Sequence, residues 1–186
     1  VTAVNASGVI DPVSGDIVLD GYAGARADLA AAPSVDIANG APSGQGAPNT
    51  IVDTWNDGDA ATSRALVIAS TNGGTTWSSP SDATEGADRA MYSAVAVSPN
   101  GHDLYLVYDA FLSPLQTTTA APRPMQGVVR HAPLTGGTIG AWATRNRGAI
   151  GDARGSSANS LAVEFLGDYN YAAATNDYGV AVWNDV

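Results

Sequence analysis

Short apolar runs separated by turn-forming residues make up most of the chain. Some runs alternate apolar and polar positions, and others are continuously apolar, as is typical of strands buried between neighbouring sheets. We predict eight strands, at residues 35–38, 50–55, 66–70, 94–98, 104–108, 127–131, 171–175 and 180–183. Only the Ala-rich stretch 24–32, which Pro33 ends, has a helical character. The pattern therefore predicts an all-β fold.

Asn-Gly dipeptides occur at 39–40, 72–73 and 100–101, each between two of the predicted strands or at the end of one. Both residues of this dipeptide tolerate positive φ, which the type I′ turn of a β-hairpin requires. We therefore expect tight antiparallel hairpins at these points.

Three segments repeat one order of features: an apolar strand, a turn with Gly, a second strand, and then an aromatic residue followed by Asp. The tripeptide Trp-Asn-Asp occurs at 55–57 and again at 183–185. We interpret Asp57, Asp109 and Asp185 as equivalent structural positions. The four tryptophans are predicted to pack between repeats: Trp55, Trp77, Trp142 and Trp183.

Composition and charge narrow the possible partners. The formal net charge is −10, all basic residues are Arg, and there is no Cys. Nucleic-acid binding requires a basic surface, so it is not expected. No apolar run approaches the ~18 residues of a membrane span, so membrane insertion is not expected. Disulfides and Cys-ligated metals are excluded by composition.

Residues 70–77 read Ser-Thr-Asn-Gly-Gly-Thr-Thr-Trp. An amide oxygen at the third position can accept backbone N–H bonds, and adjacent glycines permit positive φ. The segment resembles the Asp-box, Ser-x-Asp-x-Gly-x-Thr-Trp, of the BNR-repeat and sialidase-like β-propellers of secreted bacterial proteins. The matching residues are Ser70, Gly74, Thr76 and Trp77, and Asn72 replaces the usual Asp. A degenerate copy follows at 134–138, before Trp142.

The resemblance implies an all-β propeller of four-stranded antiparallel blades, six in number when complete. In the family, the Asp-box hairpin joins the third and fourth strands of a blade. We assign the whole chain, 1–186, to one partial propeller with blade-like repeats at 33–82, 85–145 and 160–186, residues 1–32 being the remnant of a preceding blade. About two and a half to three blades do not close a ring. We therefore expect the missing blades in a longer protein, or self-association.

The sialidase mechanism implied by the resemblance uses three Arg to hold a carboxylate, a Tyr nucleophile with a Glu, and an Asp acid/base. The residues that fit these roles for catalysis are Asp168, Tyr169 and Glu164. The candidates for ligand binding are Arg89, Tyr92, Arg145, Arg147 and Arg154. Each has a plainer interpretation, as a solvated loop residue, a turn cap or a residue packed between blades. The Arg-Ile-Pro motif of the family is absent.

Two functional hypotheses follow from these residues. The first is a secreted, sialidase-like propeller that binds or hydrolyses glycans at the channel mouth. The second is a non-catalytic propeller that binds an extracellular or cell-surface ligand. We expect no cofactor, although the Asp-rich stretch 53–59 offers the oxygen ligands that a structural Ca²⁺ takes; a plain turn is the favoured alternative there.

Overall fold

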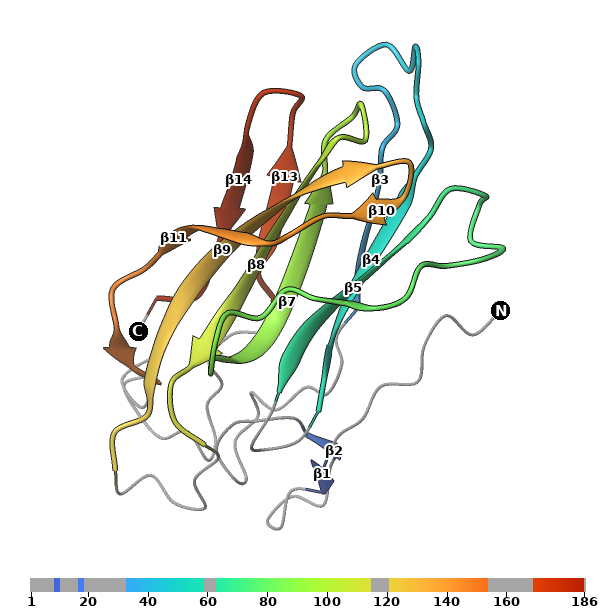
Figure 1. Ribbon diagram of the computed structural model, residues 1–186. Helices are drawn as coiled ribbons and strands as arrows, with labels where there is room; N and C mark the ends of the chain where they lie inside the picture. The colour runs from blue at the N-terminus through green and yellow to red at the C-terminus, as the bar shows by residue number, and fades with distance from the viewer. Residues whose placement is uncertain are drawn as a thin grey trace.

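The computed structural model describes residues 33–58, 63–114, 121–153 and 169–185, and the backbone of two short strands near the N-terminus (Figure 1). All regular elements within these residues are strands, apart from a single 3₁₀ position at Ala153, and every strand pair is antiparallel. The predicted all-β class is therefore confirmed. The expected helix at 24–32 lies outside the described residues.

The first sheet has four strands that are neighbours in chain order. They are β3 (Ser34–Ile37), β4 (Ile51–Asp57), β5 (Arg64–Ser70) and β6 (Ser81–Asp82). All four strands lie within the predicted repeat at 33–82.

The second sheet begins with three long strands, β7 (Arg89–Val97), β8 (Asp103–Phe111) and β9 (Pro124–Thr135). Three shorter strands then pair with β9: β10 (Thr138–Ile139), β11 (Ala143–Arg147) and β12 (Gly151–Asp152). The sheet extends a few residues beyond the predicted repeat at 85–145.

Two hairpins complete the described strands. Strands β13 (Tyr171–Ala174) and β14 (Gly179–Val182) form one, and β1 (Val9–Ile10) and β2 (Ile17–Val18) form the other. All eight strands predicted from the sequence are therefore present. The short strands β6, β10, β11 and β12 were not predicted, because two to five residues give too little periodicity.

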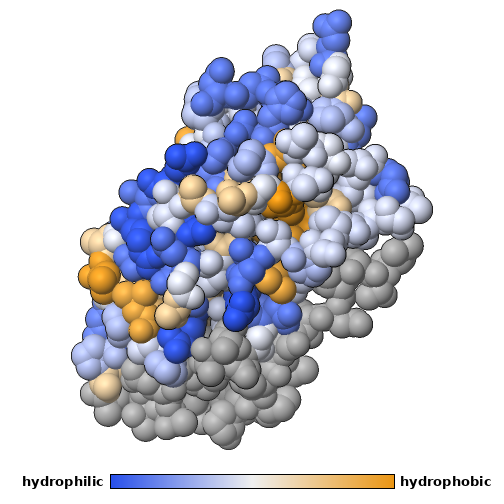
Figure 2. All heavy atoms as spheres, viewed as in Figure 1, coloured by the Kyte–Doolittle hydropathy of each residue, from blue (hydrophilic) through white to orange (hydrophobic). Residues whose placement is uncertain are grey.

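The sheets stack face to face, with the second sheet between the first sheet and the β13–β14 hairpin (Figure 1). Buried small and branched side chains fill the space between them, among them Val52, Val67, Leu106 and Val128. On the other side, Trp183 lies so close to Gly127 of β9 that a Cβ there would be 2.1 Å from the indole ring. Trp183 thus packs between repeats, as predicted. Hydrophilic residues cover most of the face visible in Figure 2. Within the described residues the sheets form no closed ring.

The turns at the Asn-Gly dipeptides are not of type I′, which corrects the sequence prediction. Only the glycines have positive φ, at 67° for Gly40, 68° for Gly73 and 73° for Gly101. Each preceding Asn instead accepts a hydrogen bond on its side-chain oxygen from a backbone N–H two or four residues later. The turns are stabilised by these side-chain bonds, and the first opens a long loop to β4.

The strand register also corrects one alignment of the repeats. Thr54 of β4, Val107 of β8 and Val182 of β14 occupy equivalent positions, opposite Ser34, Ala94 and Tyr171 of the first strands. The next residue is aromatic in every case, and the one after it is Asn56, Asp109 or Asn184. Asp109 is therefore equivalent to the two asparagines, and not to Asp57 and Asp185 as predicted.

Candidate functional site

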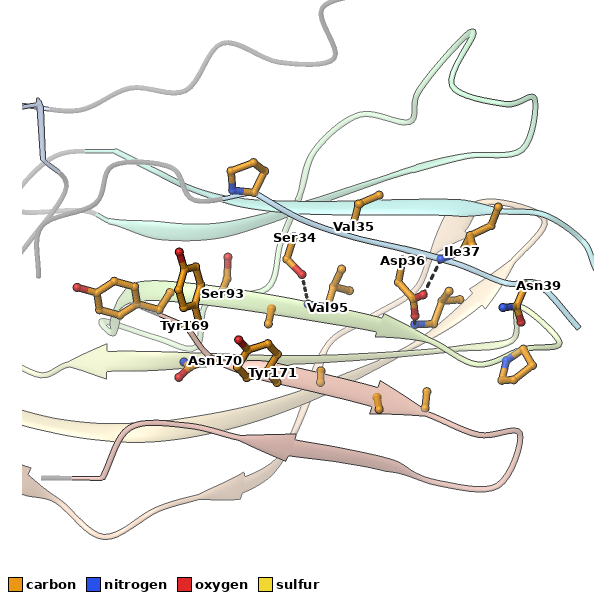
Figure 3. A pocket seen from close by; sticks show the side chains of 18 of the residues that line it. Ser34, Val35, Asp36, Ile37, Asn39, Ser93, Val95, Tyr169, Asn170 and Tyr171 are labelled. Atoms are coloured by element: carbon orange, nitrogen blue, oxygen red, sulfur yellow. Dashed lines mark hydrogen bonds between the residues drawn. The ribbon is translucent and has the colours of Figure 1, made fainter. Parts of the chain in front are cut away.

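The first strands of the three stacked sheets line one groove, which we call the first-strand groove. Its volume is about 520 Å³. Its walls come from β3, β7 and β13 with their flanking residues, namely 33–37, 39, 41, 92–95, 97, 99 and 169–174. Strand β7 lies between β3 and β13 (Figure 3). The groove thus lies where three sheets begin, although its residues are far apart in the chain.

Tyr92 lies in this groove at an irregular point of β7. The register of β7 against β8 shifts between Met91 and Ala94, and Tyr92 has a φ of 53°. Positive φ is unfavourable for a bulky residue, so the surrounding structure must hold this conformation. The sequence analysis named Tyr92 as a ligand-binding candidate, and it does line the groove, although it is nearly fully buried.

Two exposed tyrosines stand at the β13 side of the groove. Tyr169 is 66% exposed and Tyr171 is 64% exposed, and their ring centroids are 6.4 Å apart (Figure 3). Tyr169 was a predicted catalytic candidate. Tyr171 was not singled out, because its position in an apolar strand resembles that of a core residue. Together they form an aromatic surface that solvent reaches.

The polar side chains of β3 serve mainly to hold it against β7. Asp36 accepts the backbone N–H of Val97 on one oxygen, at 2.9 Å, and that of Ile37 on the other. Ser34 accepts the N–H of Val95 at 3.4 Å. No Arg, Lys or His is among the described residues that line the groove. Among the described lining residues, the only charge is therefore the carboxylate of Asp36.

Asn170 connects the groove to a buried carboxylate. Asn170 lines the groove and is only 6% exposed. Among the described residues, neither its amide oxygen nor its amide nitrogen has a hydrogen-bond partner of good geometry. Asp109 behind it is fully buried and accepts a hydrogen bond from the Asn184 amide at 3.1 Å. Burial raises the pKa of Asp109 to about 7, although the amides of Asn184 and Asn170 oppose the shift.

Arg147 does not reach the groove; it is held in an ion-pair network on β11. Its guanidinium donates to both oxygens of Asp88, at 3.0 and 2.9 Å, and also pairs with Glu85. The same Asp88 accepts the hydroxyl of Tyr108, whose pKa is raised by burial. A hydrogen bond from Thr144 and the neighbouring Arg147 and Arg130 lower the pKa of Glu85. This network attaches the loop before β7 to the second sheet.

Arg145 and Arg89, two further predicted ligand-binding residues, are also not among the residues that line the groove. Arg145 is exposed, with its guanidinium 2.9 Å from Nδ1 of His131. Arg89, at the start of β7, borders a separate small cavity of about 140 Å³ with Arg64 and Asp82. Asp88, the partner of Arg147, lines the same small cavity as Arg89. Arg154, Glu164 and Asp168 lie outside the described residues.

The Asp-box-like segment forms a compact turn between β5 and β6, the third and fourth strands of the first sheet. Ser70 Oγ accepts the N–H of Gly74, and Asn72 accepts the N–H of Thr76, both at 2.9 Å. Gly73 and Gly74 have positive φ, and the Trp77 ring lies beside Gly74. The predicted position and bonding of this turn are confirmed. Trp77 is only half-buried, so it covers the turn more than it fills a core.

Neither a metal centre nor a membrane span is found in the described part of the chain. No three His, Asp or Glu residues there lie close enough to hold an ion, and Asp59 of the predicted calcium stretch lies outside it. The described residues include no helix long and apolar enough to cross a bilayer.

Comparisons with known proteins give a weak likeness. No family model matches the chain, and neither does any curated protein. Among solved structures it is similar to a Trypanosoma rangeli sialidase in complex with sialic acid, with 14% identity and a TM-score of 0.39 over 80% of this chain and 23% of that one. The same enzyme with the inhibitor DANA gives 15% identity and a TM-score of 0.34, over 75% and 25%. The chain thus spans about a quarter of these structures, and the likeness does not establish an activity.

Proposed function

We propose that this protein is an extracellular carbohydrate-binding module of β-propeller type, which binds its ligand in the first-strand groove. The observation that carries the proposal is the convergence of three first strands on one groove with two exposed tyrosines at its side. The Asp-box-like turn between the third and fourth strands of the first sheet adds support at the level of sequence resemblance.

The aromatic surface suits a sugar ring. The C–H face of a pyranose is apolar and packs against an aromatic ring, while the hydroxyls at its edge seek hydrogen bonds. Tyr169 and Tyr171 offer both a ring face and a phenolic hydroxyl on an exposed surface. A groove of about 520 Å³ has room for one or two sugar units.

The charge distribution favours uncharged sugars. Carboxylated sugars are usually held by the paired N–H groups of Arg, and the described groove lining has none. Asp36 adds a negative charge at the wall, and the whole chain carries −10. Both would repel an anionic ligand at low ionic strength. We therefore infer a neutral glycan as the ligand.

Glycan hydrolysis of the exo-sialidase type is a second candidate, because Tyr169 is exposed at the groove. In this alternative Tyr169 is the nucleophile, Glu164 assists it and Asp168 acts as acid/base. A carboxylate clamp would then need Arg154 or another arginine beyond the described lining.

Binding is tested with purified protein and a panel of neutral mono- and disaccharides, by titration calorimetry. The Tyr171→Ala variant should weaken binding at least tenfold. Tyr178→Ala is the matched control, since Tyr178 is 60% exposed on the same hairpin but does not line the groove. Absence of binding to every neutral sugar, or equal losses in the two variants, would refute the proposal.

Hydrolysis is tested on a fluorogenic sialoside and on neutral aryl glycosides. The binding hypothesis expects no release of the fluorophore or aryl group. Turnover that disappears in Tyr169→Phe, and is retained in Tyr178→Phe, would establish the enzymatic alternative instead.

A further inference from the structure

Asp36 is fixed at the wall of the first-strand groove by backbone hydrogen bonds. Strand β7 is the end strand of its sheet, and among the described strands it pairs with β8 alone. One oxygen of Asp36 accepts the N–H of Val97 on β7 at 2.9 Å, and the other accepts the N–H of Ile37 at 2.8 Å (Figure 3). Bonds to two strands therefore hold the carboxylate in place before any ligand arrives.

The same carboxylate keeps acceptor sites for a ligand. A carboxylate offers about four lone-pair sites, shared by its two oxygens. Each oxygen of Asp36 takes one backbone N–H, so each retains a further site. None of the ion pairs among the described residues involves Asp36. The side chain is half-buried, so a molecule in the groove can reach these oxygens.

The groove beside Asp36 has room for a sugar ring. The residues of β13 that line it beyond Tyr171 are all Ala, at 172–174, and their small side chains take up little space. In Figure 3, Asp36 lies further along the groove than Tyr169 and Tyr171. A ligand of two sugar units with one ring at the tyrosines therefore places its other ring toward the carboxylate.

We propose that Asp36 determines the specificity of the first-strand groove by accepting hydrogen bonds from two adjacent hydroxyls of a neutral sugar, one on each oxygen. This inference rests on the proposed binding of a neutral glycan in the same groove. A carboxylate accepts hydrogen bonds but does not donate them, so it selects hydroxyl donors over ether oxygens and over positions without a polar group. A bond to a charged acceptor is also stronger than one between neutral groups.

The first experiment uses the wild-type protein and changes the ligand. The tightest-binding sugar of the neutral panel is compared by titration calorimetry with derivatives in which one hydroxyl at a time is removed or methylated. Loss of either of two adjacent hydroxyls should weaken binding about tenfold or more, because one Asp36 oxygen then loses its donor. Changes at the other positions should have smaller effects.

The second experiment changes the protein and measures selectivity. Asp36→Ser removes the carboxylate but keeps a hydroxyl, the group with which Ser34 accepts a β7 N–H at 3.4 Å, so β3 should stay attached. We expect weaker binding of the parent sugar and little change for the deoxy derivative, so that the ratio of the two affinities falls toward one. Asp36→Asn, which keeps one acceptor oxygen, should lower the ratio in the same direction.

Ser34→Ala is the matched control. It removes a bond between β3 and the Val95 N–H while the Asp36 carboxylate stays, so the ratio of affinities should remain that of the wild type. A looser β3 alone lowers both affinities and leaves their ratio unchanged. Circular dichroism verifies the fold of each variant.

The outcomes separate this inference from the proposed function. If no neutral sugar binds the wild type, the proposed function is wrong and this inference falls with it. If a sugar binds and Tyr171→Ala weakens it, but no pair of adjacent hydroxyls matters or the Asp36 variants keep the wild-type ratio, then the groove binds glycans and Asp36 serves only to hold β3.

Discussion

The side chain of Asn56, on β4 of the first sheet, accepts the backbone N–H of Ser93, on β7 of the second sheet, at 3.0 Å. Its amide nitrogen donates to the carbonyl of Ala90 at 3.0 Å. Both bonds are buried and cross between sheets at the irregular point of β7 beside Tyr92. One amide therefore bonds to backbone groups on both sides of Tyr92 and ties the first sheet to the second.

Replacing Asn56 by Ala should lower the free energy of unfolding by about 1–3 kcal/mol, because the buried N–H of Ser93 loses its acceptor. The Ala90 carbonyl keeps its hydrogen bond from the Ser63 hydroxyl. Urea unfolding measures the change. Asn146→Ala is the control, since Asn146 is exposed on β11. Equal effects of the two substitutions would show that the inter-sheet bonds do not stabilise the fold.

Asn72 should tolerate Asp but not Ala. Its side-chain oxygen accepts the N–H of Thr76, and a carboxylate can do the same. We expect Asn72→Ala to cost about 1 kcal/mol and Asn72→Asp to be close to neutral. Thermal unfolding at neutral pH compares them. A larger loss for Asp than for Ala would contradict the interpretation of the turn as Asp-box-like.

Stability should depend on pH through Asp109. Burial raises its pKa to about 7, whereas an unfolded Asp titrates near ~4. The folded protein therefore holds a proton that the unfolded chain has released, and the resulting stabilisation is full below pH ~4 and lost as the pH rises through about 7.

The comparison variant for this pH dependence is Asp109→Asn, which keeps an acceptor for the Asn184 amide. Urea unfolding from about pH 4 to about pH 8 should show the wild type losing stability relative to the variant. If the difference in stability between wild type and Asp109→Asn did not change with pH, Asp109 would have the same pKa in the folded and unfolded states.

Arg147 should matter for folding and not for ligand binding. Arg147→Ala removes the paired hydrogen bonds to Asp88 and the contact with Glu85, so we expect a loss of about 1–2 kcal/mol. Arg145→Ala, at an exposed position on the same strand, should change stability little. If Arg147→Ala instead abolished glycan binding at unchanged stability, the arginine would belong to a ligand clamp.

The local features of this protein follow from its sequence alone. All eight predicted strands and the turn between Ser70 and Trp77 are present, because strand alternation and side-chain bonds such as Asn72 to Thr76 involve residues close together in the chain. The turn type at Asn39, Asn72 and Asn100 was wrongly predicted. Asn can adopt either positive or negative φ, and the hydrogen bonds of its side chain decide which one it takes.

The arrangement of the candidate site was decided by tertiary structure. The equivalence of Asp109 with Asn56 and Asn184 depends on the register between strands, which a shift of one residue would change. The pairing of Arg147 with Asp88 joins residues that no local pattern links. The role of Tyr171 at the groove likewise arises only when the first strands of three sheets meet, because contacts between distant segments are set by packing and not by neighbouring residues.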